Sequence, residues 1–354
     1  MRHFLRRLRR THRPAFAALW ILVALYGAAF LADCIAPYPY DLQNRAYSLC
    51  PPTPVRFRET GGGLHLRPFV YRVELENPAL NTYRTDRTTI HPVRLFVTGP
   101  TRKLLGIIPS QRYLFGTDDT APIFLFGTDM NGRDIFSRII YGSRISLSIG
   151  ILGVSISFLL GLLIGGISGY FGGRTDTILM RTVEIVMTFP AFYLLLALRA
   201  TFPTNLSSVQ IYLLITVILS FIGWASLARI IRGMVLSLKE EEYVLAARSL
   251  GLSRLRIIIR HILPNTLSYT VTALTLSVPG YILGESGLSL IGLGIQEPFP
   301  SWGNMLAVTI GNLRILTTAP WMLLPGFFIF LTIISFNFLG DGLRDVMDPS
   351  GKTG

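Results

Sequence analysis

The sequence predicts an all-α polytopic membrane protein with six transmembrane helices and an extracytoplasmic β-containing insert after the first helix. Of the 354 residues, 50% are hydrophobic and only 15% are charged, whereas soluble domains carry about a quarter charged residues. Six separate runs stay apolar for about 20 residues, the length that a helix needs to cross a bilayer. With only two cysteines and abundant apolar residues, a disulfide-rich scaffold and a disordered chain are both excluded.

Each of the six runs is a separate expected helix. They cover residues 14–36, 145–170, 182–200, 211–231, 267–291 and 319–339. The second run is rich in glycine, and Gly161 and Gly165 form a small-xxx-small pair, which is typical of helices that pack closely in membranes. We therefore expect a packing face on this helix.

Basic residues predict the orientation, because lysine and arginine near span ends stay in the cytoplasm. Residues 1–13 form a basic tail, and residues 229–260, from the end of the fourth run into the connection to the fifth, carry seven Lys and Arg residues. Both termini, including the tail 346–354, are therefore expected in the cytoplasm of a multi-pass protein of the bacterial cytoplasmic membrane. Residues 31–34 resemble a lipoprotein cleavage box, but Asp33 occupies the position that needs a small residue, so an uncleaved anchor is expected.

The expected extracytoplasmic insert covers residues 37–123. It begins rich in proline, and after Gly61–Gly63 the residues 69–75 alternate between apolar and polar, a period-2 pattern that predicts a strand. Residues 90–97 give a weaker strand pattern. Cys50 lies in the insert and Cys34 at the outer end of the first run, so a disulfide is one alternative in an oxidising compartment and free thiols are the other.

No motif predicts catalysis, a cofactor or a metal. Gly351-Lys352-Thr353 resembles the end of a phosphate-binding loop, but Val346 stands where its first glycine belongs. Residues 284–288 resemble a nucleophile elbow that ends in Leu288 rather than glycine. The five histidines have no metal-ligand spacing. We therefore expect no catalytic residue, no cofactor, no metal site and no ATP-binding loop.

Two acidic residues lie inside expected spans. An ionisable group in a membrane is a candidate functional residue, so Glu285 is a possible pore or gate residue; the alternative is a structural side chain that reaches water near the helix end. Glu184 follows Arg181 by three positions, which predicts a local ion pair. Isolated acids make a poor proton relay.

Residues 239–264 form the most informative connection. Acids including Glu242 precede a helical pattern in which Tyr243, Ala246, Ala247 and Leu250 share one face, and Gly251 is expected to end this helix in a left-handed conformation. A basic amphipathic helix follows, and Pro264 stands at the entry to the fifth run. We expect a two-helix protrusion whose small-residue face docks into a partner; the alternative is a helix lying on lipid.

Separate blocks resemble one known family. Residues 242–251 and 263–265 resemble the EAA loop of bacterial ABC importer permeases, with Leu245 and His261 replacing that loop's glutamate and isoleucine. Residues 127–147 resemble the signature before the second span of dipeptide and oligopeptide permeases, and 35–38, 292–303 and 340–349 resemble its C-type subunit. The resemblance covers about 14–40 and 124–350. The signature residues are Gly127, Asp129, Gly132, Arg133 and Asp134.

The resemblance implies a permease subunit without its own ATPase activity that imports di- or oligopeptides or related small molecules. Its membrane domain would be 124–345. Its partners would be a second permease subunit, two ABC ATPase subunits docked on 239–264, an extracytoplasmic substrate-binding protein and the lipid bilayer, with no nucleic acid. The other classes are a secondary transporter and a membrane-anchored binding or structural protein. A secondary transporter should show broken helices in matching repeats, and Pro190 and Pro279 are not equivalent in this way.

Overall fold

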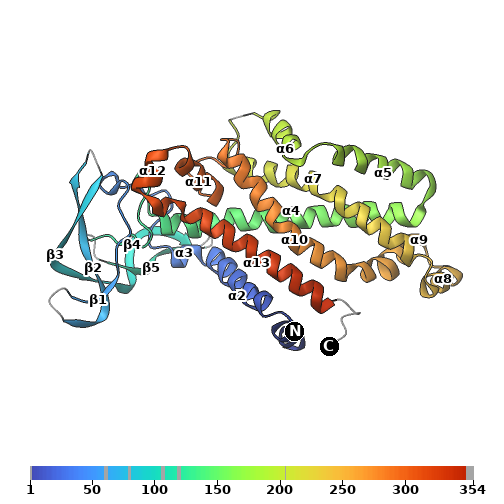
Figure 1. Cartoon of the computed structure of the whole chain (residues 1–354), viewed down its shortest axis with the longest axis horizontal. Coiled ribbons are helices and arrows are strands. Elements are labelled where there is room, and N and C mark those ends of the chain that lie inside the picture. Colours follow the sequence, from blue (N-terminus) through green and yellow to red (C-terminus); the bar gives the residue numbers. More distant parts are fainter. Residues whose placement is uncertain are drawn as a thin grey trace. The chain divides into compact units, whose positions relative to one another are not determined.

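The computed structural model is mainly helical and describes residues 2–59, 63–78, 81–104, 108–117, 121–203 and 205–347 (Figure 1). Gly61, Gly62 and residues 348–354, which include the Gly-Lys-Thr triplet and most of the expected C-terminal tail, lie outside this description. The chain forms two compact units. Residues 1–22, 148–288 and 331–354 make the first, and residues 23–147 and 289–330 make the second.

Four helices in the described ranges are long and apolar enough to cross a membrane: α2 (Arg13–Phe30), α4 (Ile135–Phe171), α7 (Ser208–Leu238) and the helix over Pro320–Met347, made of η3 (Pro320–Leu323) and α13 (Leu324–Met347). Each overlaps one of the expected runs, although α2 ends at Phe30 and the first run was expected to continue to residue 36. A fifth span results if the bent pair α5 (Gly173–Thr188) and α6 (Ala191–Ala200) is taken as one.

The expected helix over 182–200 is not continuous. The chain instead bends by 86° between α5 and α6. Phe189 is extended, with ψ 133°, and Pro190 follows it. Because the proline ring disfavours helical geometry in the preceding residue and proline lacks an N–H donor, the helix must end there and restart.

The expected fifth span corresponds to α10 (Leu263–Leu290). This helix is long enough to cross a bilayer but is less apolar than the other four, because threonines and serines recur along it. Several of their hydroxyl groups bond the carbonyl four residues earlier, as Thr270 does to Thr266 (2.7 Å) and Ser277 does to Ala273 (2.7 Å). A helix can keep such hydroxyls satisfied in an apolar environment. The count of six spans therefore stays a prediction.

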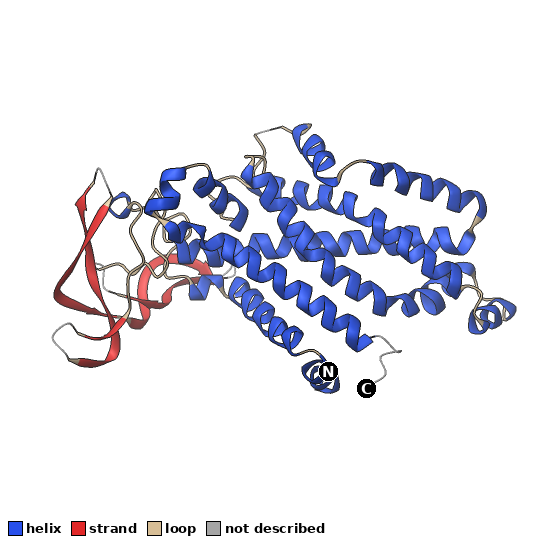
Figure 2. Cartoon of the chain, viewed as in Figure 1, coloured by secondary structure: helices blue, strands red, loops and turns tan. Residues whose placement is uncertain are grey.

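The strands all belong to the second unit (red in Figure 2). β1 (Arg56–Arg58), β2 (Leu64–Asn77) and β3 (Thr82–Pro92) form an antiparallel sheet in that order, and β4 (Arg94–Leu104) pairs with β5 (Ile108–Gly116). The strand expected at 69–75 is confirmed within β2. The weaker strand pattern at 90–97 falls on the end of β3 and the start of β4. Only Val93 lies between these two strands, and its N–H donates to the Pro68 carbonyl (2.8 Å).

Short helices complete the two units. They are α1 (Arg2–Thr11), α3 (Ala32–Ile35), η1 (Arg45–Tyr47), α8 (Glu242–Ser249), α9 (Arg254–Ile257), η2 (Ile258–Ile262), α11 (Trp302–Ile310) and α12 (Leu313–Thr318). In the second unit, Trp302 is fully buried and its indole N–H donates to the Ile139 carbonyl (3.0 Å), which fixes α11 on α4.

The glycine-rich face of α4 packs on α7, as expected. A Cβ built on Gly161 would lie 2.8 Å from Leu227 Cδ2, and one on Gly165 would lie 2.9 Å from Ile231 Cβ. Only glycine allows the two backbones to approach this closely, so the packing prediction for this helix is confirmed.

Both cysteines are free thiols in the structure. Cys34 is exposed, whereas Cys50 is fully buried and burial raises the pKa of its thiol to about 12. The Cys50 N–H donates to Thr128 Oγ1 (2.8 Å). Cys50 therefore contacts the segment that leads into α4.

Candidate functional sites: an arginine cluster and a helical knob

The segment over 127–134 folds around the Asp129 carboxylate. Its Oδ1 accepts the N–H groups of Asn131 (2.8 Å) and Arg133 (3.0 Å), which closes a tight loop. Gly127 and Gly132 adopt φ +73° and +70°, in the left-handed region that favours glycine. A Cβ on Gly132 would also overlap the backbone carbonyl of Asn44. These demands explain why glycines stand at both signature positions.

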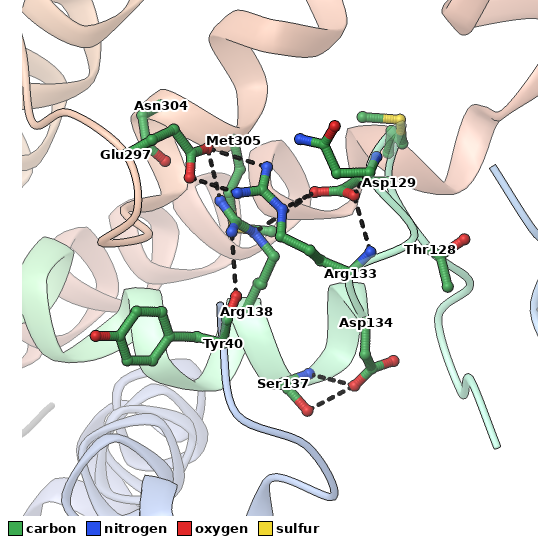
Figure 3. Close-up of polar contacts among 12 residues, drawn as sticks. Tyr40, Thr128, Asp129, Arg133, Asp134, Ser137, Arg138, Glu297, Asn304 and Met305 are labelled. Atoms are coloured by element: carbon green, nitrogen blue, oxygen red, sulfur yellow. Dashed lines mark hydrogen bonds and ion pairs between the residues drawn. The ribbon is translucent and has the colours of Figure 1, made fainter. Parts of the chain in front are cut away.

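This loop presents two buried guanidinium groups to Glu297 (Figure 3). Arg133 Nε donates to Asp129 Oδ2 (2.7 Å), and its two terminal nitrogens contact the two carboxylate oxygens of Glu297 at 2.5 and 3.1 Å. Arg138 Nη2 donates to Glu297 Oε1 (2.9 Å) and its Nη1 to the Tyr40 carbonyl (3.2 Å). We call Asp129, Arg133, Arg138 and Glu297 the arginine cluster.

The arginine cluster balances two positive against two negative charges. The side chains of Arg133 and Arg138 are only 8% and 2% exposed, whereas that of Glu297 is 44% exposed. Burial by itself would raise the pKa of Glu297, but the positive charges of Arg138 and Arg133 outweigh it and lower that pKa. Buried ion pairs are favourable only with such complete hydrogen bonding. The cluster therefore joins the loop around Glu297 firmly to the first turns of α4.

Asp134 begins α4 beside the cluster but does not join it. Its Oδ2 accepts the Ser137 N–H (2.8 Å) and the Ser137 hydroxyl (2.6 Å), which satisfies one of the free N–H groups of the first turn. The side chain is 3% exposed, and burial raises the pKa of its carboxyl to about 7.

We expect this carboxyl to make the protein less stable as the pH rises from about 4 to about 7. In this interval the unfolded side chain has lost its proton while the folded one retains it, so the folded state binds more protons and stability falls with pH. Asp134→Asn should retain the bonds to Ser137 and flatten this part of the profile. Thermal unfolding midpoints of both proteins across this range provide the measurement, and equal slopes would contradict the prediction.

The second candidate site is the knob, residues 242–262, built from α8, α9 and η2. Gly251 ends α8 with φ +74°, which confirms the expected left-handed conformation. A Cβ on Gly251 would meet nothing within 4 Å, so only the backbone conformation requires glycine there. After η2, Pro264 lies in the first turn of α10. η2 is a short π-helix, whose turns are wider than those of an α-helix. Proline has no N–H to donate to the carbonyl four residues earlier, so this irregular turn can directly precede Pro264.

The knob buries one face of α8 and exposes the other. Val244 and Ala247 are 0% and 4% exposed and pack with Ile231, Val235 and Ile257, whereas Leu250 is 82% exposed. Tyr243 and Ala246 are exposed, as is Glu242. The expectation that Ala247 shares the exposed docking face is therefore wrong. At about 100° per residue, position 247 lies at the edge of that face, nearest to Val244.

Contacts with neighbouring helices hold the knob in place. The Arg248 guanidinium lies 5.9 Å from the centre of the Tyr170 ring, and Asn265 Nδ2 donates to the Tyr243 hydroxyl (3.1 Å). One α7 turn before Val235, Arg232 forms a two-pronged ion pair with Asp176 of α5 (2.5 and 2.6 Å). The knob is therefore in contact with α4, α7 and α10.

The two acidic residues expected inside spans have different environments in the structure. Glu184 pairs with Arg181 (2.9 Å) on an exposed surface, which confirms the local ion pair. Glu285 is 0% exposed, which contradicts the alternative in which its side chain reaches water. Its role at a pore or gate stays a prediction. Among the described residues, no three His, Cys, Asp or Glu side chains gather in a way that could hold a metal.

The sequence pointed to Asp129 and Arg133 but missed Arg138 and Glu297 as their partners. Both residues lie inside the quoted blocks, yet Glu297 is 164 positions from Arg133. Each of these charged residues, taken alone, could lie on the protein surface. No local sequence pattern therefore predicted that they pair.

Two family models match separate parts of this chain. Residues 161–352 match the family described as "Binding-protein-dependent transport system inner membrane component", and residues 1–52 match "N-terminal TM domain of oligopeptide transport permease C". A solved amino acid ABC transporter aligns with 58% of this chain and 92% of its own, at 19% identity and a TM-score of 0.43.

Two curated relatives extend the match. The oligopeptide transport system permease protein OppC of Haemophilus influenzae is 45% identical over 228 residues, which are 64% of this chain and 70% of the relative. The dipeptide transport system permease protein DppC of Bacillus subtilis is 45% identical over 225 residues, 63% of this chain and 68% of the relative. The chain therefore belongs to the family of inner membrane components of binding-protein-dependent transport systems.

Proposed function

We propose that this chain is a permease subunit of an ABC importer for di- or oligopeptides or related small molecules, powered by separate ATPase subunits that dock on the loop 239–264. The knob is the observation that carries this proposal. It is packed onto α4, α7 and α10 on one face and presents Leu250 on the other. A rigid protrusion of this kind can transmit a partner's movement into the membrane helices. The names of the two permease relatives support peptides as the substrate class.

The other partners follow from the same role. A second permease subunit would complete the pore, and a substrate-binding protein would deliver peptide on the side of the insert 37–123. The membrane domain would be 124–345, and Glu285 remains a candidate for the pore or gate. In this arrangement the chain itself performs no ATP hydrolysis.

Leu250→Asp should abolish docking without unfolding the protein. The side chain is 82% exposed, so folding should tolerate a carboxylate, but an ATPase surface that receives a leucine should not. We expect copurification with the ATPase subunits to fall at least about tenfold and peptide uptake to be lost, with an unchanged thermal midpoint.

Two variants serve as controls for this experiment. Leu66→Asp places the same charge at a fully exposed leucine of β2 and should leave copurification unchanged. Ala247→Trp should lower the thermal midpoint, because overpacking a buried site costs about 1–3 kcal/mol. Parental binding by Leu250→Asp would contradict the assignment of the knob.

We expect cysteine labelling to confirm the orientation. A membrane-impermeant maleimide applied to spheroplasts should label exposed Cys34 and spare Cys50, which is buried and has a raised thiol pKa. In a Cys34→Ser background, Ser253→Cys should react only after the membrane is opened, because residue 253 would lie in the cytoplasm. Labelling at 253 in sealed spheroplasts would contradict the orientation.

A further inference from the structure

The N-terminal helix α1 gathers arginines on one side. Arg6, Arg7, Arg9 and Arg10 are exposed, and Arg13 follows at the start of α2, whereas Leu8 is 0% exposed. At about 100° per residue, the four arginines of α1 fall within about 160° of arc opposite Leu8, and Arg13 lies beyond the break at His12. The helix thus has a continuous cationic face, which we call the arginine face.

The apolar side of α1 is occupied by the protein itself. Leu8 packs with Ala15 of α2 and Val346 of α13. A Cβ built on Gly342 of α13 would lie 3.1 Å from Leu8 Cδ1, so this glycine provides the space into which the leucine fits. The arginine face therefore points away from the protein.

A break at His12 turns α1 away from the spanning helix α2. His12 Nδ1 accepts the Ala15 N–H (3.1 Å) and caps the new helix, with Pro14 in its first turn. In Figure 1, α1 is seen nearly end-on beside the N label, while α2 runs across the view. Because α2 is a candidate span, α1 lies across the end of a membrane helix.

The arginine face has little negative charge around it. Among the described residues, neither the four guanidinium groups of this face nor that of Arg13 forms an ion pair with a carboxylate, and Arg9 lies 5.9 Å from the centre of the Phe16 ring. On α13, Asp341 and Asp345 are exposed, together with Arg344. The arginines thus outnumber these acidic residues, and the surface can attract an external anion.

We propose that the arginine face is a binding surface for the phosphate groups of anionic phospholipids. A cluster of basic residues directly beside a membrane span attracts anionic headgroups. One guanidinium group can donate two parallel hydrogen bonds to two oxygens of a phosphate. Since Leu8 is held by the protein, this helix does not need to insert an apolar face into the bilayer. Binding should therefore be electrostatic, weakened by salt, and specific for headgroup charge.

Lipid titration of the purified full-length chain in mild detergent tests this proposal. Phosphatidylglycerol should bind and phosphatidylcholine should not. The quadruple variant Arg6→Gln, Arg7→Gln, Arg9→Gln and Arg10→Gln should weaken phosphatidylglycerol binding at least about tenfold, because each such contact contributes about fivefold. The corresponding Arg→Lys variant should retain most of the binding.

A matched variant in the insert separates a local site from net charge. Replacing exposed Arg56, Arg58, Arg84 and Arg87 by glutamine removes the same charge and should leave phosphatidylglycerol binding unchanged. An equal loss in both quadruple variants would overturn the proposal. Displacement of the lipid by millimolar inorganic phosphate would show a free phosphate site instead. Tighter binding of a single-stranded oligonucleotide than of phosphatidylglycerol would identify a nucleic-acid surface. Either result would overturn the proposal of a lipid-binding surface.

Discussion

Glu297→Gln should destabilise the protein strongly, by about 3 kcal/mol. The substitution leaves Arg133 and Arg138 buried without the carboxylate that bridges them, and breaking a buried ion pair costs about 3–5 kcal/mol. We expect the lower end, because Asp129 still pairs with Arg133 and Glu297 itself is partly exposed. A lower thermal midpoint and a lower yield of monodisperse protein in detergent are the measurements.

Glu184→Gln is the matched control, since it makes the same change in the exposed ion pair with Arg181 and should cost less than about 0.5 kcal/mol. Combining Glu297→Gln with Arg138→Met should cost less than the sum of the single changes, because the double variant removes the buried charge together with its partner. Equal costs for Glu297→Gln and Glu184→Gln, or simple additivity, would show that the arginine cluster is not a coupled unit.

Gly132→Ala should also prevent correct folding of most molecules. The position combines φ +70° with a Cβ that would overlap the Asn44 carbonyl, a backbone atom that cannot move aside like a flexible side chain. Backbone strain and steric overlap together should lower the free energy of unfolding by about 3 kcal/mol or more. Size-exclusion profiles of a fluorescent fusion and thermal midpoints should both show the loss.

Gly251→Ala separates the effect of backbone strain from the effect of steric overlap. Gly251 has a similar φ of +74° but open space around its Cα, so alanine should cost only about 1 kcal/mol there. If both alanine variants were equally stable, the steric explanation for Gly132 would be wrong.

Features that depend on neighbours along the chain could be predicted from sequence. The apolar runs follow from their length, the strand over 69–75 from a period of two residues, and the Arg181–Glu184 pair from positions three apart. Gly251 was predictable for the same reason, because a helix that must stop and turn needs a left-handed residue just after its end. In each case one or two turns of chain contain the whole physical cause.

Which side of a pattern turns inward was decided only by tertiary packing. The face with Tyr243, Ala246, Ala247 and Leu250 is correct as a helical face, but Val244 and Ala247 together meet Ile231 and Val235, so the buried arc is shifted. Likewise, Cys50 packs with Val73 and Phe124, which are distant in sequence, and neither its burial nor that of Glu285 has a local pattern.

The sequence by itself determined that the chain is a mainly helical membrane protein with a strand-containing insert and a knob that ends at Gly251. Tertiary structure alone decided that Glu297 joins Arg133 and Arg138, that the chain bends at Pro190 instead of crossing straight, and that Leu8 leaves the arginine face free. The physical reason is range. Backbone propensities and helical periodicity act over a few residues, whereas desolvated charges and packed side chains are paired by whatever the fold brings within a few ångströms.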